Sequence, residues 1–157
     1  VLSVGFSIDG QTIEVYQAGA RHEPDPEPPN EMDVISIFWD YFADCRGNCV
    51  GYNLLSFDLP FLLARSMYLS IHIPYLPVLA KFRTEPVTDL YAIRYNWGPG
   101  KGLKTVCKLL GIPNDCPDIE GSMVKDLDPE MLRAYQASDV KLTIDLYKRM
   151  NGVYFQH

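Results

Sequence analysis

The sequence lacks the features that mark several protein classes. It has no apolar run near the about 20 residues that a transmembrane helix needs, and no signal peptide, so we expect no membrane partner and a cytoplasmic location. Basic residues are few, with 14 Lys and Arg against 20 Asp and Glu and a formal net charge of −6. This balance excludes the broad basic surface of a protein that coats duplex DNA. Any nucleic acid must be held locally.

Cysteine is scarce and irregularly spaced. The four cysteines Cys45, Cys49, Cys107 and Cys116 form no C-x-x-C pair, and the histidines are scattered at positions 22, 72 and 157. A zinc site needs clustered Cys and His ligands. The sequence therefore predicts free thiols in a reducing compartment rather than a zinc centre.

What is present is the composition of a folded domain. The chain has 157 residues, of which 47% are hydrophobic and 22% charged, enough to bury one core. No repeat, linker or low-complexity tract divides it, so we predict a single domain over residues 1–157. Strands near the start, followed by helices that alternate with short strands, predict an α/β fold with a mixed sheet.

Local signals predict the order of the elements. β-Branched and aromatic residues on both sides of Asp9-Gly10 predict a hairpin over residues 1–16, and the prolines of 22–30 predict a surface loop. A short strand is expected at 49–53, whereas 71–93 shows no clear periodicity. Apolar spacing, caps and stop signals predict helices over 33–41, from 56 or 57 to 69, over 103–110, and over 129–150 with Asp128 as N-cap.

Two aspartates stand where an ionised carboxylate is expensive. Asp58 lies in the apolar stretch 51-GYNLLSFDLPF-61, and one interpretation is a helix-start carboxylate satisfied by backbone N–H groups. Asp139 is alternatively a solvated residue at the rim or a partner of Lys141. Both interpretations compete with a shared role facing a cation. Asp139 falls on one helical face with Leu132, Tyr135, Leu142 and Leu146.

The residues around both aspartates resemble motifs of a known family. Asn53-Leu54-Leu55-Ser56-Phe57-Asp58-Leu59-Pro60 resembles the second motif of the DEDD superfamily of 3′–5′ exonucleases. Tyr135-Gln136-Ala137-Ser138-Asp139 resembles the third motif of its tyrosine-bearing branch. These motifs are most similar to those in the exonuclease domain of family B DNA polymerases. The resemblance covers nearly the whole chain. It implies a ribonuclease H-like fold, a mixed β-sheet flanked by helices.

The resemblance also implies a reaction and its ligands. The expected activity is metal-dependent hydrolysis of terminal phosphodiester bonds at a nucleic acid 3′ end, with DNA preferred over RNA. Two Mg²⁺ or Mn²⁺ ions suit hard oxygen ligands and an in-line displacement. In this scheme Asp58 and Asp139 bind the metals and Tyr135 holds the attacking water. Asn53 would orient the substrate or its own loop.

Three more residues are candidates for substrate contact. Lys101 and Lys104 lie in the stretch 98-GPGKGLKT-105, which is not the G-x4-G-K-[ST] of a nucleotide P-loop but could grip a backbone phosphate. Phe57 could stack on a terminal base. The alternatives are solvated lysines and a phenylalanine that packs in the core.

One motif of the family is missing from its expected place, Asp-x-Glu on the first sheet strand. Asp25-Pro26-Glu27 lies in the proline loop and Asp118-Ile119-Glu120 comes too late in chain order, so neither is expected to serve. The hairpin is similar to the family's second and third strands, and we expect the first strand to precede Val1. Without its carboxylates, the alternative is a catalytically inactive ribonuclease H-like domain that binds nucleic acid or acts as a scaffold. A ribonuclease on the same fold is the third hypothesis.

Overall fold

The computed structural model of the protein describes residues 3–20, 27–117, 119 and 121–155. Strands β1 (Ser3–Phe6) and β2 (Glu14–Gln17) pair antiparallel, which confirms the predicted hairpin. The turn at Asp9-Gly10 sits inside a wider loop than predicted. The reason is that Asp9 Oδ1 accepts hydrogen bonds from the amides of Gln11 and Thr12, at 2.8 and 2.7 Å, and these groups are then unavailable to a ladder. Most of the predicted proline loop lies outside the described residues.

Helix α1 (Glu31–Asp44) is the first predicted helix, extended at both ends. Asn30 caps it, since its Oδ1 accepts from the amides of Met32 and Asp33 at 2.8 and 3.1 Å, and Asp33 accepts in return from the Asn30 amide at 2.8 Å. Its buried face carries Val34, Ile35, Trp39 and Phe42.

Strand β3 (Cys49–Gly51) follows and leads into the stretch that contains Asp58. The predicted second helix appears in two parts, a π-helical turn η1 (Leu54–Asp58) and the α-helix α2 (Leu59–Leu69). Pro60 lies in the first turn of α2, where its missing N–H is tolerated, as predicted. α2 packs on α1, and the Trp39 indole donates to Ser66 Oγ at 2.8 Å across that contact.

The segment 71–93, which lacks periodicity, contains two short elements. Strand β4 (Val87–Asp89) pairs parallel to β3, with Gly51 opposite Asp89. Helix α3 (Leu90–Arg94) begins directly after it. The two strands therefore end side by side at one edge of the sheet.

The last third of the chain is helical, as predicted. α4 (Leu103–Leu109) ends before Gly111, which adopts the left-handed φ of 68°. A short 3₁₀ turn η2 (Gly121–Asp126) precedes α5 (Pro129–Met150). Asp128 accepts from the Met131 amide at 2.8 Å, which confirms it as the N-cap of α5.

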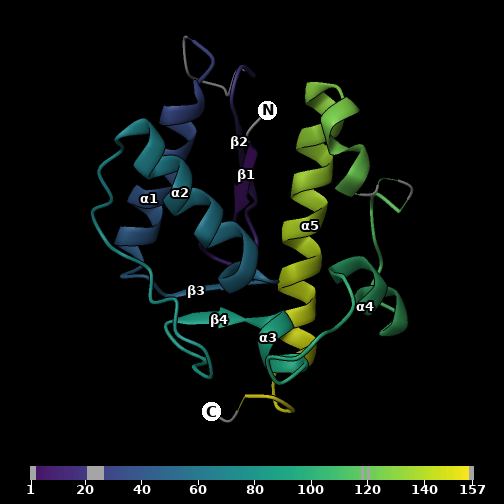
Figure 1. Cartoon of the computed structure of the whole chain (residues 1–157). Helices are drawn as coiled ribbons and strands as arrows, with labels where there is room; N and C mark the ends of the chain where they lie inside the picture. Colours follow the sequence, from purple (N-terminus) through teal and green to yellow (C-terminus); the bar gives the residue numbers. More distant parts are fainter. Residues whose placement is uncertain (1–2, 21–26, 118, 120, 156–157) are drawn as a thin grey trace.

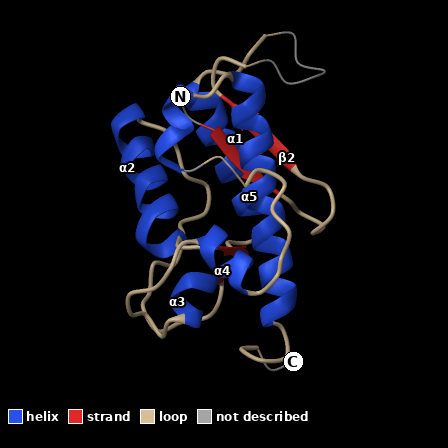
Figure 2. Ribbon diagram, turned by 90° about the vertical axis from the view of Figure 1, so that its right-hand side faces the viewer, coloured by secondary structure: helices blue, strands red, loops and turns tan. Residues whose placement is uncertain are grey.

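These elements form a mixed α/β arrangement of small sheets flanked by helices. Figure 1 shows α1 and α2 on one side, α5 on the other, β1 and β2 between them, and β3 and β4 crossing below. Figure 2 shows α3 and α4 at the end near the C-terminus. The sequence predicted one mixed sheet, but within the described ranges there are two, the antiparallel pair β1–β2 and the parallel pair β3–β4. Residues of β1 and β3 line a cleft that separates the pairs.

The hydrophobic core follows this division into two clusters. Ile35, Trp39, Leu59 and Leu62 pack between α1 and α2. Leu90, Val106, Leu142 and Leu146 pack between α3, α4 and α5. No described helix combines the length and the apolar character that a membrane crossing requires.

Candidate active site

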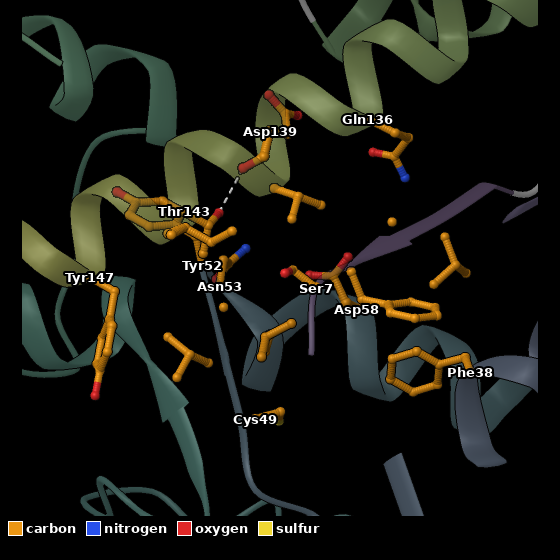
Figure 3. A pocket seen from close by; sticks show the side chains of 18 of the residues that line it. Ser7, Phe38, Cys49, Tyr52, Asn53, Asp58, Gln136, Asp139, Thr143 and Tyr147 are labelled. Atoms are coloured by element: carbon orange, nitrogen blue, oxygen red, sulfur yellow. Dashed lines mark hydrogen bonds between the residues drawn. The ribbon is translucent and has the colours of Figure 1, made fainter. Parts of the chain in front are cut away.

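A cleft of about 1470 Å³ opens between the two sheets. It is lined by β1, by β3 and the turn after it, by the start of α2, and by one face of α5. Asp58 and Asp139 both line this cleft, the first from the junction of η1 and α2 and the second from α5 (Figure 3). Two carboxylates that lie far apart in the sequence thus border one space.

Asp58 is a partly buried carboxyl with a raised pKa. Burial is the main cause and the nearby Asp89 carboxylate adds to it, so that the pKa rises from 3.8 to about 6. The Asp58 side chain makes no capping hydrogen bond to α2, and a hydrogen bond with its own backbone amide acts against the rise in its pKa. Its charge is left available to a ligand of the cleft.

Asp139 and Tyr135 lie one turn apart on α5. Burial raises the pKa of Asp139, while the Lys104 ammonium and a hydrogen bond with Tyr135 act against that rise. Burial, and then the Asp139 carboxylate, raise the pKa of Tyr135 to about 12. Among the described residues, Asp139 Oδ1 is buried without a hydrogen-bond partner. Lys141, the alternative partner of Asp139, instead pairs with Asp115 at 2.7 Å.

Lys104 is turned toward the protein interior. Its Nζ lies 4.4 Å from the centroid of the Tyr135 ring and donates to the carbonyl of Cys116 at 3.1 Å and to that of Ile119. Its role in gripping a backbone phosphate stays a prediction, since in this structure the ammonium turns to groups of the protein itself. The physical reason is that the long stem of a lysine lets tertiary contacts choose its direction.

The glycine-rich loop before α4 lies at the edge of the cleft, which Gly102 and Leu103 line. Two tyrosines hold it, since the Tyr52 hydroxyl donates to the Lys101 carbonyl and the Gly100 amide donates to the Tyr91 hydroxyl at 2.7 Å. The residue Lys101 is exposed on this loop.

Phe57 and Asn53 both line the cleft, and neither is a core residue. Phe57 is 63% exposed and stacks with Phe61, with ring centroids 6.4 Å apart and an angle of 10° between the planes. The alternative that Phe57 packs in the core is wrong. Asn53 has the left-handed φ of 65° and ψ of 25°, and it begins the turn that leads to Asp58.

Sequence reasoning missed Asp89. This carboxylate is 1% exposed and accepts hydrogen bonds from the amides of Asn53 and Leu55 at 2.8 and 3.0 Å. The signal that could have found it is the run 86-PVTDL-90, in which β-branched residues end at an aspartate, a good N-cap for a following helix.

The two cleft carboxylates suit a hard divalent cation. Carboxylate oxygens are preferred ligands of Mg²⁺ and Mn²⁺, and within the described ranges neither Asp58 nor Asp139 is bound in an ion pair. The buried, unpartnered oxygen of Asp139 is the atom best explained by such a ligand. No group of three or more Cys, His, Asp or Glu residues converges in the described part of the chain. Asp25, Asp118 and Glu120 of the two Asp-x-Glu stretches lie outside that part.

The chain matches a known protein family. The model of the family described as a predicted 3′–5′ exonuclease related to the exonuclease domain of PolB matches residues 4–154. The match spans both motifs, the hairpin and α5. No curated protein matches the chain significantly.

Proposed function

The chain belongs to the family of predicted 3′–5′ exonucleases related to the exonuclease domain of PolB, and we propose that it removes nucleotides from the 3′ end of DNA with two divalent cations. One observation carries the proposal. Asp58 and Asp139 line one cleft, with Tyr135 one turn away from Asp139 on the same helix.

Each residue of this set has a role that its environment supports. Asp58 and Asp139 would hold the cations, Mg²⁺ or Mn²⁺. Bound cations supply Lewis-acid stabilisation of the charge on the attacking and leaving oxygens. The pKa of Tyr135, raised to about 12, keeps its hydroxyl protonated at neutral pH. Tyr135 would then orient the attacking water by hydrogen bonding.

The proposed substrate end is single-stranded, because a base must leave its stack to reach a partly buried site. Phe57, exposed beside the cleft, offers a face on which a terminal base can stack. Asn53 borders the same space, and Lys101 is exposed on the adjoining loop, where it can meet a phosphate. These local contacts suit a chain whose net charge is −6.

We also propose the finer assignment of the fold as ribonuclease H-like, with residues 1–157 acting as one domain. An antiparallel hairpin, a parallel pair and helices on both sides support it. Asp58, at the junction of η1 and α2, and Asp139, in the middle of α5, then border the same cleft.

An assay on a 3′-labelled single strand with Mg²⁺ or Mn²⁺ tests the activity. We expect stepwise shortening, and a loss of about 10²-fold in rate for Asp139→Asn, the scale for one charge-stabilising group. Asp115→Asn is the control, because that carboxylate pairs with Lys141 and does not line the cleft. Digestion by Asp139→Asn at the parent rate would show the assignment to be wrong. An RNA oligomer of the same sequence tests the preference for DNA.

The second candidate is an inactive domain that binds nucleic acid. It is favoured by the finding that no group of three or more His, Cys, Asp or Glu residues converges in the described part of the chain. It predicts binding of the single strand without cleavage, and no rise of Tm with Mn²⁺. The exonuclease predicts such a rise in the parent and a smaller one in Asp58→Asn.

A further inference from the structure

Asp89 is a buried carboxylate with four backbone partners and, among the described residues, no ion-pair partner. Its Oδ1 accepts from the amides of Asn53, Tyr91 and Ala92 at 2.8, 3.0 and 3.3 Å, and its Oδ2 accepts from that of Leu55 at 3.0 Å. A charge buried to 1% exposure is costly unless hydrogen bonds compensate it. Charge-assisted bonds of this kind are stronger than neutral ones. Apolar packing therefore does not explain why a carboxylate is buried at position 89.

Capping of α3 explains only half of these bonds. The amides of Tyr91 and Ala92 are the free donors of the first turn of α3, which an N-cap normally satisfies. The amides of Asn53 and Leu55 belong to a different segment, after β3. A serine would cap α3 with its shorter side chain, whereas the two outer bonds need the reach and both oxygens of an aspartate.

The outer bonds hold the turn that carries Asp58. Asn53 is left-handed, and the π-helical turn Leu54–Asp58 follows it at once. Within the turn, the Phe57 amide donates to the Asn53 carbonyl at 3.1 Å. Asp89 sits opposite Gly51, the last residue of β3, so its carboxylate meets the chain just where the chain leaves the sheet. The same turn ends at Asp58, which lines the cleft.

We propose that Asp89 is a positioning residue that clamps the 53–58 turn to β4 and so holds Asp58 on the cleft opposite α5. The clamp rests on the proposed function, since it serves a residue of the proposed site. It acts through Asn53 and Leu55 and touches neither substrate nor cation.

Amide hydrogen exchange tests the clamp without any substrate. In Asp89→Ser we expect the amides of Asn53 and Leu55 to lose protection while those of Tyr91 and Ala92 keep it. In Asp89→Asn the new NH₂ group faces the Leu55 amide, so protection falls at Leu55 more than at Asn53. Val34→Ala, a buried change in α1 away from the cleft, is the control for lost stability. Unchanged protection at Asn53 and Leu55 would overturn the proposal.

Kinetics separate positioning from general destabilisation. We expect Asp89→Ser to lower kcat by about 10²-fold, the scale for displacing a reacting group by 1 Å, with little change in KM for the single strand. Val34→Ala should keep the parent kcat below its Tm. If Asp89→Ser loses protection yet cleaves at the rate of Val34→Ala, the clamp does not position Asp58.

The experiments distinguish a failure of the clamp from a failure of the proposed function. If the parent binds Mn²⁺, seen as a rise in Tm, but cleaves nothing, the exonuclease proposal fails. The clamp is then judged by the Mn²⁺ shift, which Asp89→Ser should reduce and Val34→Ala should not. In a parent without cleavage and without a shift the exonuclease proposal fails, and the protection of the Asn53 and Leu55 amides in Asp89→Ser still decides whether Asp89 clamps the turn.

Discussion

The ammonium nitrogen of Lys104 lies 4.4 Å from the centroid of the Tyr135 ring. The contact joins α4 to the face of α5 that borders the cleft, and it places a positive charge close to Asp139. Lys104 also donates to the carbonyls of Cys116 and Ile119, so one side chain links these two residues to α5. Lys104, which the sequence predicts to contact the substrate, thus also lowers the pKa of Asp139 against the effect of burial.

Replacing Lys104 should change the titration of Asp139. The ammonium lowers the pKa of that carboxyl against the effect of burial, so Lys104→Met should raise it. Carboxyl ¹³C chemical shifts followed against pH measure the change. Lys108→Met, on the exposed side of α4, removes the same charge and should leave Asp139 as in the parent. An Asp139 titration that is identical in both variants would contradict this prediction.

Asp58→Asn should stabilise the cation-free protein at neutral pH. The pKa of Asp58 is about 6 in the folded chain against 3.8, so the folded state binds this proton more tightly than the unfolded state. The parent therefore loses stability as pH rises from about 4 through 6, by up to about 3 kcal/mol. Asparagine does not titrate, so the advantage of the variant should be absent at pH 4 and complete above pH 7.

Urea unfolding at several pH values in EDTA measures this advantage. Asp126→Asn serves as a matched change, since Asp126 is exposed on η2 and does not line the cleft. A difference between Asp58→Asn and the parent that stays constant from pH 4 to 8 would show that Asp58 is not the buried acid described here.

Phe57→Ala should weaken the binding of a single strand. Stacking on one aromatic side chain contributes about 1–3 kcal/mol per base, which corresponds to a Kd higher by roughly 5- to 150-fold. Fluorescence anisotropy of a labelled oligonucleotide in Ca²⁺ measures it. Tyr68→Ala is the control, because Tyr68 is 77% exposed on α2, the helix that follows η1, but does not line the cleft. Equal losses in the two variants would rule out a specific stacking role.

Ser66→Ala should reduce stability and leave the site intact. The Trp39 indole donates to Ser66 Oγ at 2.8 Å in the buried contact of α1 with α2. Removing the acceptor leaves that N–H unsatisfied, at a cost of about 1–3 kcal/mol of unfolding free energy. Thermal unfolding compares it with Ser56→Ala, whose hydroxyl is exposed. A parent-like Tm for Ser66→Ala would mean that the indole finds another partner.

Elements with strong local signals could be predicted from the sequence. The cap Asp128 and the apolar stripe of α5 are confirmed, as is the hairpin around Asp9-Gly10. Membership of the exonuclease family follows in the same way, because both motifs are short runs that can be read directly. Each of these features is encoded within one turn or a few residues.

The sequence did not predict β4 and α3. Strand β4 spans Val87–Asp89 and is held by pairing with β3, so its own sequence carries too little signal to specify a strand. Asp89 was missed with it, since its importance lies in bonds to Asn53 and Leu55. The sequence predicted a single mixed sheet, whereas the described residues form two separate strand pairs. Contacts between distant segments decide which strands pair, and the sequence does not show these contacts.

The residue types of the site, Asp58, Tyr135 and Asp139, were determined by the sequence alone, together with the helices that carry them. Only the tertiary structure decided that the two carboxylates border one cleft, that Lys104 faces inward, and that Asp89 holds the turn before Asp58. The physical reason is the distance along the chain over which each interaction acts. Caps and periodicity act over a few residues of one element, whereas burial, charge proximity and the direction of long side chains depend on which elements pack together.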